Sequence, residues 1–134
     1  MVLSIQDALI YLMVVTAAAD RALSDQELNR MNILVKRLPI FENYNLDKLP
    51  AAAAECTDLL TNVGVEGVLE LVIAKIPKHL HDTAYALAVE IAAADLEVRQ
   101  EELRWLEMVR DNLNIDRLTT AAIEVAARAR LRKA

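Results

Sequence analysis

The sequence has 134 residues, and its 15 lysines and arginines against 20 aspartates and glutamates give a net charge of −5. Hydrophobic residues make up 55% and charged residues 26% of the chain, which excludes a disordered protein and allows one domain with a buried core. The negative charge disfavours nucleic acid as a partner, because phosphate backbones repel an acidic protein. Only 4% of the residues are aromatic and two are glycine, which favours an all-α fold over strands.

Hydrophobic periodicity and helix-end signals predict about seven helices in a compact bundle. Ser24 and Glu27 have the spacing of a capping box, and Ser4 with Asp7 gives a variant of it before the first apolar run. Gly64 is expected to end the third helix. The expected helices span residues 5–19, 24–38, 46–62, 65–76, 82–94, 99–113 and, after the cap Asp116, 117–133.

Neither the first apolar run nor the cysteine content indicates a membrane or secreted protein. The run 8–19 is shorter than the roughly 20 residues of a membrane-spanning helix, and no basic residue precedes it as in a signal peptide. Cys56 is the only cysteine, so an internal disulfide is excluded and a reducing compartment fits. We therefore expect a cytoplasmic location.

An internal repeat is the most informative feature of the sequence. An offset of 75 positions, from residue 20 to residue 95, places residues 17–20 on 92–95 with the same letters, Ala-Ala-Ala-Asp. The same offset places Glu27 on Glu102, so a carboxylate at a helix end and another seven positions later recur in one context. The repeat predicts two helical hairpins, residues 4–38 and 79–113, related by a pseudo-twofold axis.

These repeated strings resemble the TerB-like family over the whole chain, residues 1–134. The likeness rests on Ala-Ala-Asp at 18–20 with Glu27 and on Ala-Ala-Asp at 93–95 with Glu102. The family includes bacterial tellurite-resistance proteins and a co-chaperone domain. The resemblance implies a single all-helical domain that acts in stress-related and metal-related systems.

The four repeated carboxylates, Asp20, Glu27, Asp95 and Glu102, allow two interpretations. In the first, which the spacing favours, they cap helices and complement helix dipoles. In the second, the pseudo-twofold axis brings the two turns together, and the four carboxylates bind a divalent cation, Ca²⁺ or Mg²⁺. The metal hypothesis stays open because Glu102 is retained in the second copy, although Arg99 there replaces the capping serine.

Other polar candidates have structural explanations. His79 and His81 are two residues apart and have no cysteine or third histidine to complete a zinc site, so a surface or capping role is expected. Cys56 has no neighbouring base or cation in the sequence that would activate its thiol, which predicts core packing. Trp105 is expected in the core rather than at a partner surface.

The C-terminal segment contains the only basic cluster, Arg128, Arg130, Arg132 and Lys133. These side chains are expected to offset the negative end of the last helix. Anionic lipid or an acidic partner is the alternative target of this cluster, but four charges are marginal for such binding, and membrane contact is disfavoured. The mean hydropathy of +0.23 indicates more apolar surface than a small monomer hides, which points to a homodimer.

No nucleophile with a base, no phosphate-binding glycine loop and no zinc ligand set is present in the sequence, so we expect no enzyme. The first functional hypothesis is a stress-response binding or scaffold module, with the divalent cation as its only candidate cofactor. The alternative is a protein-interaction module of the co-chaperone kind, in which an apolar groove or the basic tail binds a protein partner. A carboxylate-cluster enzyme is the third hypothesis, and it requires an open polar pocket.

Overall fold

The computed structural model describes residues 3–18, 22–94 and 100–134, and only the backbone of residues 100–102. All the regular secondary structure of the described residues is helical, as predicted, with no strand. Three short 3₁₀ turns, Pro39–Phe41, Leu46–Lys48 and Lys78–Leu80, lie between the longer helices. The α-helices are α1 (Ile5–Ala18), α2 (Asp25–Arg37), α3 (Leu49–Lys75), α4 (His81–Ala93), α5 (Gln100–Asn112) and α6 (Arg117–Arg130).

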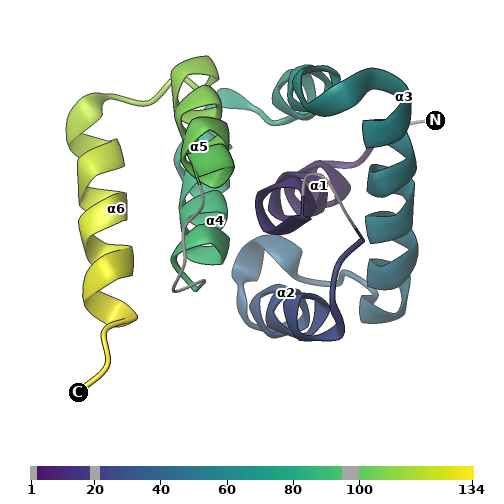
Figure 1. Ribbon diagram of the computed structural model, residues 1–134, viewed down its shortest axis with the longest axis horizontal. Coiled ribbons are helices and arrows are strands. Elements are labelled where there is room, and N and C mark those ends of the chain that lie inside the picture. Colours follow the sequence, from purple (N-terminus) through teal and green to yellow (C-terminus); the bar gives the residue numbers. More distant parts are fainter. Residues whose placement is uncertain (1–2, 19–21, 95–99) are drawn as a thin grey trace.

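Helix α1 lies at the centre of the molecule, between α3 and α4 (Figure 1). Its residues from Ala8 to Val15 are all buried, which explains why this run is apolar on every side of the helix. Within the described residues, none of the helices has both the length and the apolarity needed to cross a membrane. Because these residues are buried, the first apolar run of the sequence forms the centre of the core.

Local signals set the helix ends. The Ser24 hydroxyl accepts a hydrogen bond from the Glu27 amide at 3.1 Å, and a Glu27 carboxylate oxygen accepts one from the Ser24 amide at 2.9 Å, which confirms the capping box. At the start of α1 only half of the expected box forms, with Ser4 accepting from the Asp7 amide at 3.0 Å. The Asp7 carboxylate accepts instead from the Tyr44 hydroxyl, at 2.9 Å.

The expected helices 46–62 and 65–76 are joined in one element, α3, so the described residues form six α-helices rather than seven. A kink divides α3 at Gly64, whose φ of 73° and ψ of 176° are not helical. Glycine adopts this positive φ without the steric cost that a Cβ atom imposes. The break was therefore predicted at the correct residue, but the chain resumes its helix at once.

His81 joins three segments of the chain through its buried imidazole ring. Its Nδ1 accepts a hydrogen bond from the Asn114 amide at 2.9 Å, and its Nε2 lies 3.1 Å from the Ile76 carbonyl oxygen. With Nδ1 as the acceptor, Nε2 carries the proton and donates to that carbonyl. This bridge ties the end of α3 and the start of α4 to the loop between α5 and α6.

Trp105 and Cys56 are core residues, as expected from the sequence. Trp105 is 5% exposed, and its indole N–H donates a hydrogen bond of 2.8 Å to the Thr16 hydroxyl on α1. Cys56 is fully buried against α1, with its sulfur 3.7 Å from the Tyr11 carbonyl oxygen. Burial raises the pKa of the Cys56 thiol to about 12.

Candidate functional site

The carboxylates of the predicted cation site are only partly described. Asp20 and Asp95 lie outside the described residues, and Glu102 lies in the first turn of α5, where only the backbone is described. Glu27 is engaged in the capping box of α2. Among the side chains that the structure describes, no group of three or more His, Cys, Asp or Glu residues is placed to hold a metal ion. The cation site therefore stays a prediction.

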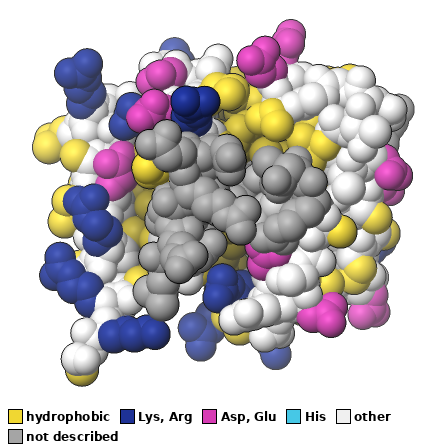
Figure 2. All heavy atoms as spheres, in the orientation of Figure 1, with side chains coloured by type: hydrophobic (Ala, Val, Ile, Leu, Met, Phe, Trp, Pro, Cys, Tyr) yellow, Lys and Arg dark blue, Asp and Glu magenta, His cyan; other side chains and the backbone are white. Residues whose placement is uncertain are grey.

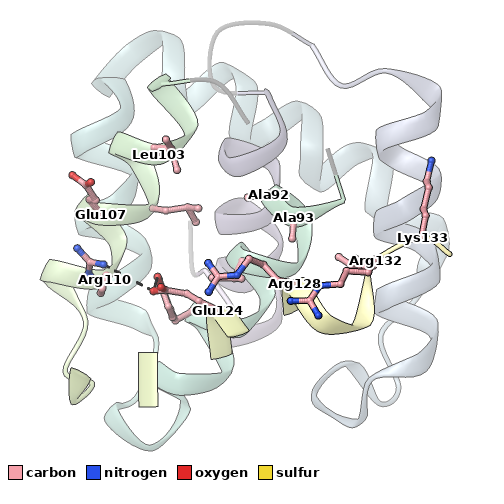
Figure 3. A pocket seen from close by; sticks show the side chains of 13 residues that line it. Ala92, Ala93, Leu103, Glu107, Arg110, Glu124, Arg128, Arg132 and Lys133 are labelled. Atoms are coloured by element: carbon pink, nitrogen blue, oxygen red, sulfur yellow. Dashed lines mark hydrogen bonds and ion pairs between the residues drawn. The ribbon is translucent and has the colours of Figure 1, made fainter. Parts of the chain in front are cut away.

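A groove lies between α5 and α6, with α4 at its base (Figure 3). Its volume is about 650 Å³. Helix α4 packs against both α5 and α6, whereas α5 and α6 have no extensive contact with each other among the described residues. The two helices thus form opposite walls of the groove.

Apolar side chains from all three helices line the groove. The base is formed by Val89, Ala92 and Ala93 of α4, whose spacing of i, i+3 and i+4 places them on one face of that helix. Leu103 of α5 and Leu131, at the end of α6, contribute apolar surface from the walls. Leu103 is 48% exposed, a large fraction for a leucine on a helix that has a buried face.

A hydrogen-bonded network closes one part of the groove. The Tyr85 hydroxyl donates a hydrogen bond of 2.6 Å to a Glu124 carboxylate oxygen, and Arg110 Nη1 lies 3.9 Å from the same oxygen. Burial of the ring, together with the hydrogen bond to Glu124, raises the pKa of Tyr85 above its usual range. This network connects α4, α5 and α6 and balances the charge of Arg110.

The wall formed by α6 and the residues after it is basic. Arg128, Arg132 and Lys133 line it, and none of the three has an ion-pair partner among the described side chains. Arg130, in contrast, pairs with Glu90 of α4. Figure 2 shows lysine and arginine side chains gathered at the left of the molecule, over α6 and the C-terminal end.

The composition of the lining defines what the groove can do chemically. The described part of the lining combines apolar side chains with charged ones, and it contains no serine, threonine, cysteine or histidine. A concave, mostly apolar surface with a few convergent polar groups is typical of a binding site.

The sequence indicates the basic wall of this groove but not the groove itself. The sequence predicts a basic cluster of Arg128, Arg130, Arg132 and Lys133 that offsets the negative end of the last helix. Leu103 lies within the predicted helix 99–113, but helical periodicity does not predict that it lines a groove. The sequence signal that points toward the groove is a basic cluster at the end of a helix that also carries apolar residues.

The sequence matches no protein-family model, no curated protein and no solved structure. The resemblance to the TerB-like family accordingly rests on the repeated Ala-Asp and Glu positions alone and stays a prediction. The groove is the feature on which a proposal of function can rest, because the structure describes its residues and contacts.

Proposed function

We propose that this chain is a non-enzymatic protein-interaction module whose groove between α5 and α6 binds an amphipathic helix of a partner protein. The observation that supports the proposal most directly is the apolar, outward-facing lining formed by Ala93, Leu103 and Leu131. An apolar groove flanked by two helices is a common receptor for the apolar face of a third one.

The dimensions of the groove suit a short helical segment. Its base extends along α4 from Tyr85 to Ala93, which at 1.5 Å per residue is about 12 Å, or two helical turns. A guest helix presents apolar residues at positions i, i+3, i+4 and i+7 over the same length. With α4, α5 and α6, such a guest would form a four-helix arrangement in which each apolar face is covered.

The wider setting that we propose is a stress-response scaffold of TerB-like kind, on the strength of the repeated strings at 18–20 and 93–95. The pseudo-twofold relation of residues 4–38 and 79–113 belongs to the same proposal. Divalent-cation binding by Asp20, Glu27, Asp95 and Glu102 is tested by calorimetric titration with Ca²⁺ and Mg²⁺. Saturable binding that disappears in an Asp20→Asn, Asp95→Asn variant would support it, and no binding would reject it.

The groove proposal is tested with a designed peptide of about 18 residues, long enough to form an isolated helix, with a leucine stripe flanked by glutamines. Fluorescence anisotropy of the labelled peptide measures binding to the whole chain. We expect Leu103→Gln to weaken binding by roughly tenfold, because the burial of one leucine is worth at least about 1.4 kcal/mol.

Leu71→Gln is the matched control, since Leu71 is 47% exposed, close to the 48% of Leu103, and lies on α3 outside the groove. This variant should bind the peptide as the wild type does. Equal binding by all three proteins, or no binding by any of them, would refute the groove as a helix receptor. Urea unfolding of both variants shows whether the fold is kept.

A further inference from the structure

We infer that the partner helix is acidic on the side that faces α6, and that Arg128, Arg132 and Lys133 select it. This inference rests on the proposed function, because it specifies the chemistry of the helix that the groove receives. Charge is distributed differently on the two walls of the groove.

The α6 wall has three cations without an ion-pair partner among the described side chains. Arg128 and Arg132 are four residues apart and lie along the same wall, with Lys133 next in the chain (Figure 3). Arg130 shows that an arginine of this helix finds a carboxylate when one is in reach, since it pairs with Glu90. The three cations of the wall can thus form ion pairs with carboxylates of a partner.

The α5 wall has no such excess of positive charge. Its Arg110 lies 3.8 Å from Asp111 and 3.9 Å from Glu124, and the neighbouring Glu107 adds a negative charge. A guest helix with acidic residues on both flanks would meet Glu107 unfavourably on this side. The asymmetry therefore sets how the guest is rotated in the groove, with its apolar face on α4 and its acidic flank on α6.

Two other occupants have to be separated from an acidic helix. An anionic membrane surface would also attract the cations of the α6 wall. A second copy of the chain is the other candidate, because each copy carries a net charge of −5. We favour the acidic helix because the cations border a recessed apolar groove, whereas a flat membrane surface cannot reach into one.

The test compares three peptides with the same leucine stripe, flanked by glutamine, glutamate or lysine. We expect the wild type to bind the glutamate peptide roughly tenfold more tightly than the lysine peptide, with the glutamine peptide between them. The preference should shrink when the ionic strength rises from about 0.05 M to about 0.5 M, because salt screens exposed charges.

Arg128→Glu should remove or reverse the preference. Arg37→Glu is its matched control, since both arginines are exposed and lie in the last turn of a helix, α6 and α2 respectively. The two substitutions change the net charge and the helix-end electrostatics equally, so only the groove distinguishes them. Arg132→Glu is a second test, because Arg132 lies beyond the end of α6 and its substitution leaves the helix intact.

The outcomes separate the two proposals. If the glutamine peptide binds in the groove but the charged peptides bind equally, the acidic partner is refuted while the helix receptor stands. If no peptide binds and vesicles with anionic lipid bind in a manner that depends on Arg128, both proposals fail and the wall is a membrane contact. If sedimentation shows self-association that Arg128→Glu abolishes and no peptide competes, the occupant is a second copy and the inference is refuted.

Discussion

The hydrogen bond between Trp105 and Thr16 is the most informative single contact to perturb, because it holds one wall of the groove against the core. The indole N–H of Trp105 on α5 donates to the Thr16 hydroxyl on α1 at 2.8 Å, and that hydroxyl donates to the Leu12 carbonyl at 2.7 Å. Thr16 is 2% exposed, so water cannot replace the hydroxyl. Thr16→Val keeps the shape of the side chain and leaves the indole N–H without an acceptor.

A buried donor without an acceptor costs about 1–3 kcal/mol. For a chain of this length we expect Thr16→Val to reduce the free energy of unfolding by about 2 kcal/mol and the melting temperature by about 6–12 °C. Urea unfolding followed by circular dichroism measures the first quantity, and thermal unfolding the second. In a Trp105→Phe background the same substitution should cost less, because no indole donor remains to be satisfied.

Thr61→Val is the control for the loss of a threonine hydroxyl. Thr61 is exposed on α3 and its hydroxyl donates to the Thr57 carbonyl at 3.2 Å, the same bond to the preceding turn that Thr16 makes. No donor depends on Thr61, so we expect a change within about 0.5 kcal/mol. Equal effects of Thr16→Val and Thr61→Val, or strictly additive effects of Thr16→Val and Trp105→Phe, would refute the argument that this bond anchors α5 to α1.

Three further predictions concern the ends and the interior of the fold. Ser24→Ala should lower the free energy of unfolding by about 1 kcal/mol in urea, because α2 loses its N-cap acceptor; an unchanged midpoint would contradict this. Cys56 should resist a thiol reagent at pH 8 until the protein unfolds, since burial raises the pKa of its thiol to about 12; labelling faster than unfolding would contradict this. Alkaline pH should destabilise the fold through Tyr11, because burial and then the nearby Glu55 raise its pKa from 10.0 to about 12. Between these values the unfolded chain loses the phenolic proton and the folded chain keeps it, so stability is full below pH 10 and falls as the pH rises toward 12. Urea midpoints that do not change from pH 9 to pH 11 would contradict that prediction.

The helices and their ends could be predicted from the sequence because they depend on neighbours within one or two turns. Ser24 and Glu27 are three residues apart, and each needs only the other to form the capping box. Asp116 likewise accepts from the Thr119 amide at 2.8 Å, which caps α6 and holds the pKa of Asp116 below its usual value. Gly64 marks its kink because a positive φ is a property of that residue alone.

Contacts between distant segments could not be read from the same patterns. Asp7 satisfies the sequence rule for a cap, yet its carboxylate accepts from Tyr44, which approaches from a turn 37 residues away. Leu103 is apolar and lies in a predicted helix, yet it is 48% exposed and lines the groove. A groove is formed by the separation of helices, and helical periodicity contains no information about that separation.

The contacts of α6 explain why the groove is preformed rather than collapsed. At one end, His81 holds the loop between α5 and α6 through the Asn114 amide, so both walls start from a fixed point. Farther along, Glu124 accepts from Tyr85 at 2.6 Å, which holds α6 on α4, and Arg110 of α5 lies 3.9 Å from the same carboxylate oxygen. A receptor that is already ordered loses little conformational entropy on binding, so the affinity for a guest helix depends mainly on the guest. Under the proposed function, discrimination between guests therefore depends on the apolar base and on the basic wall.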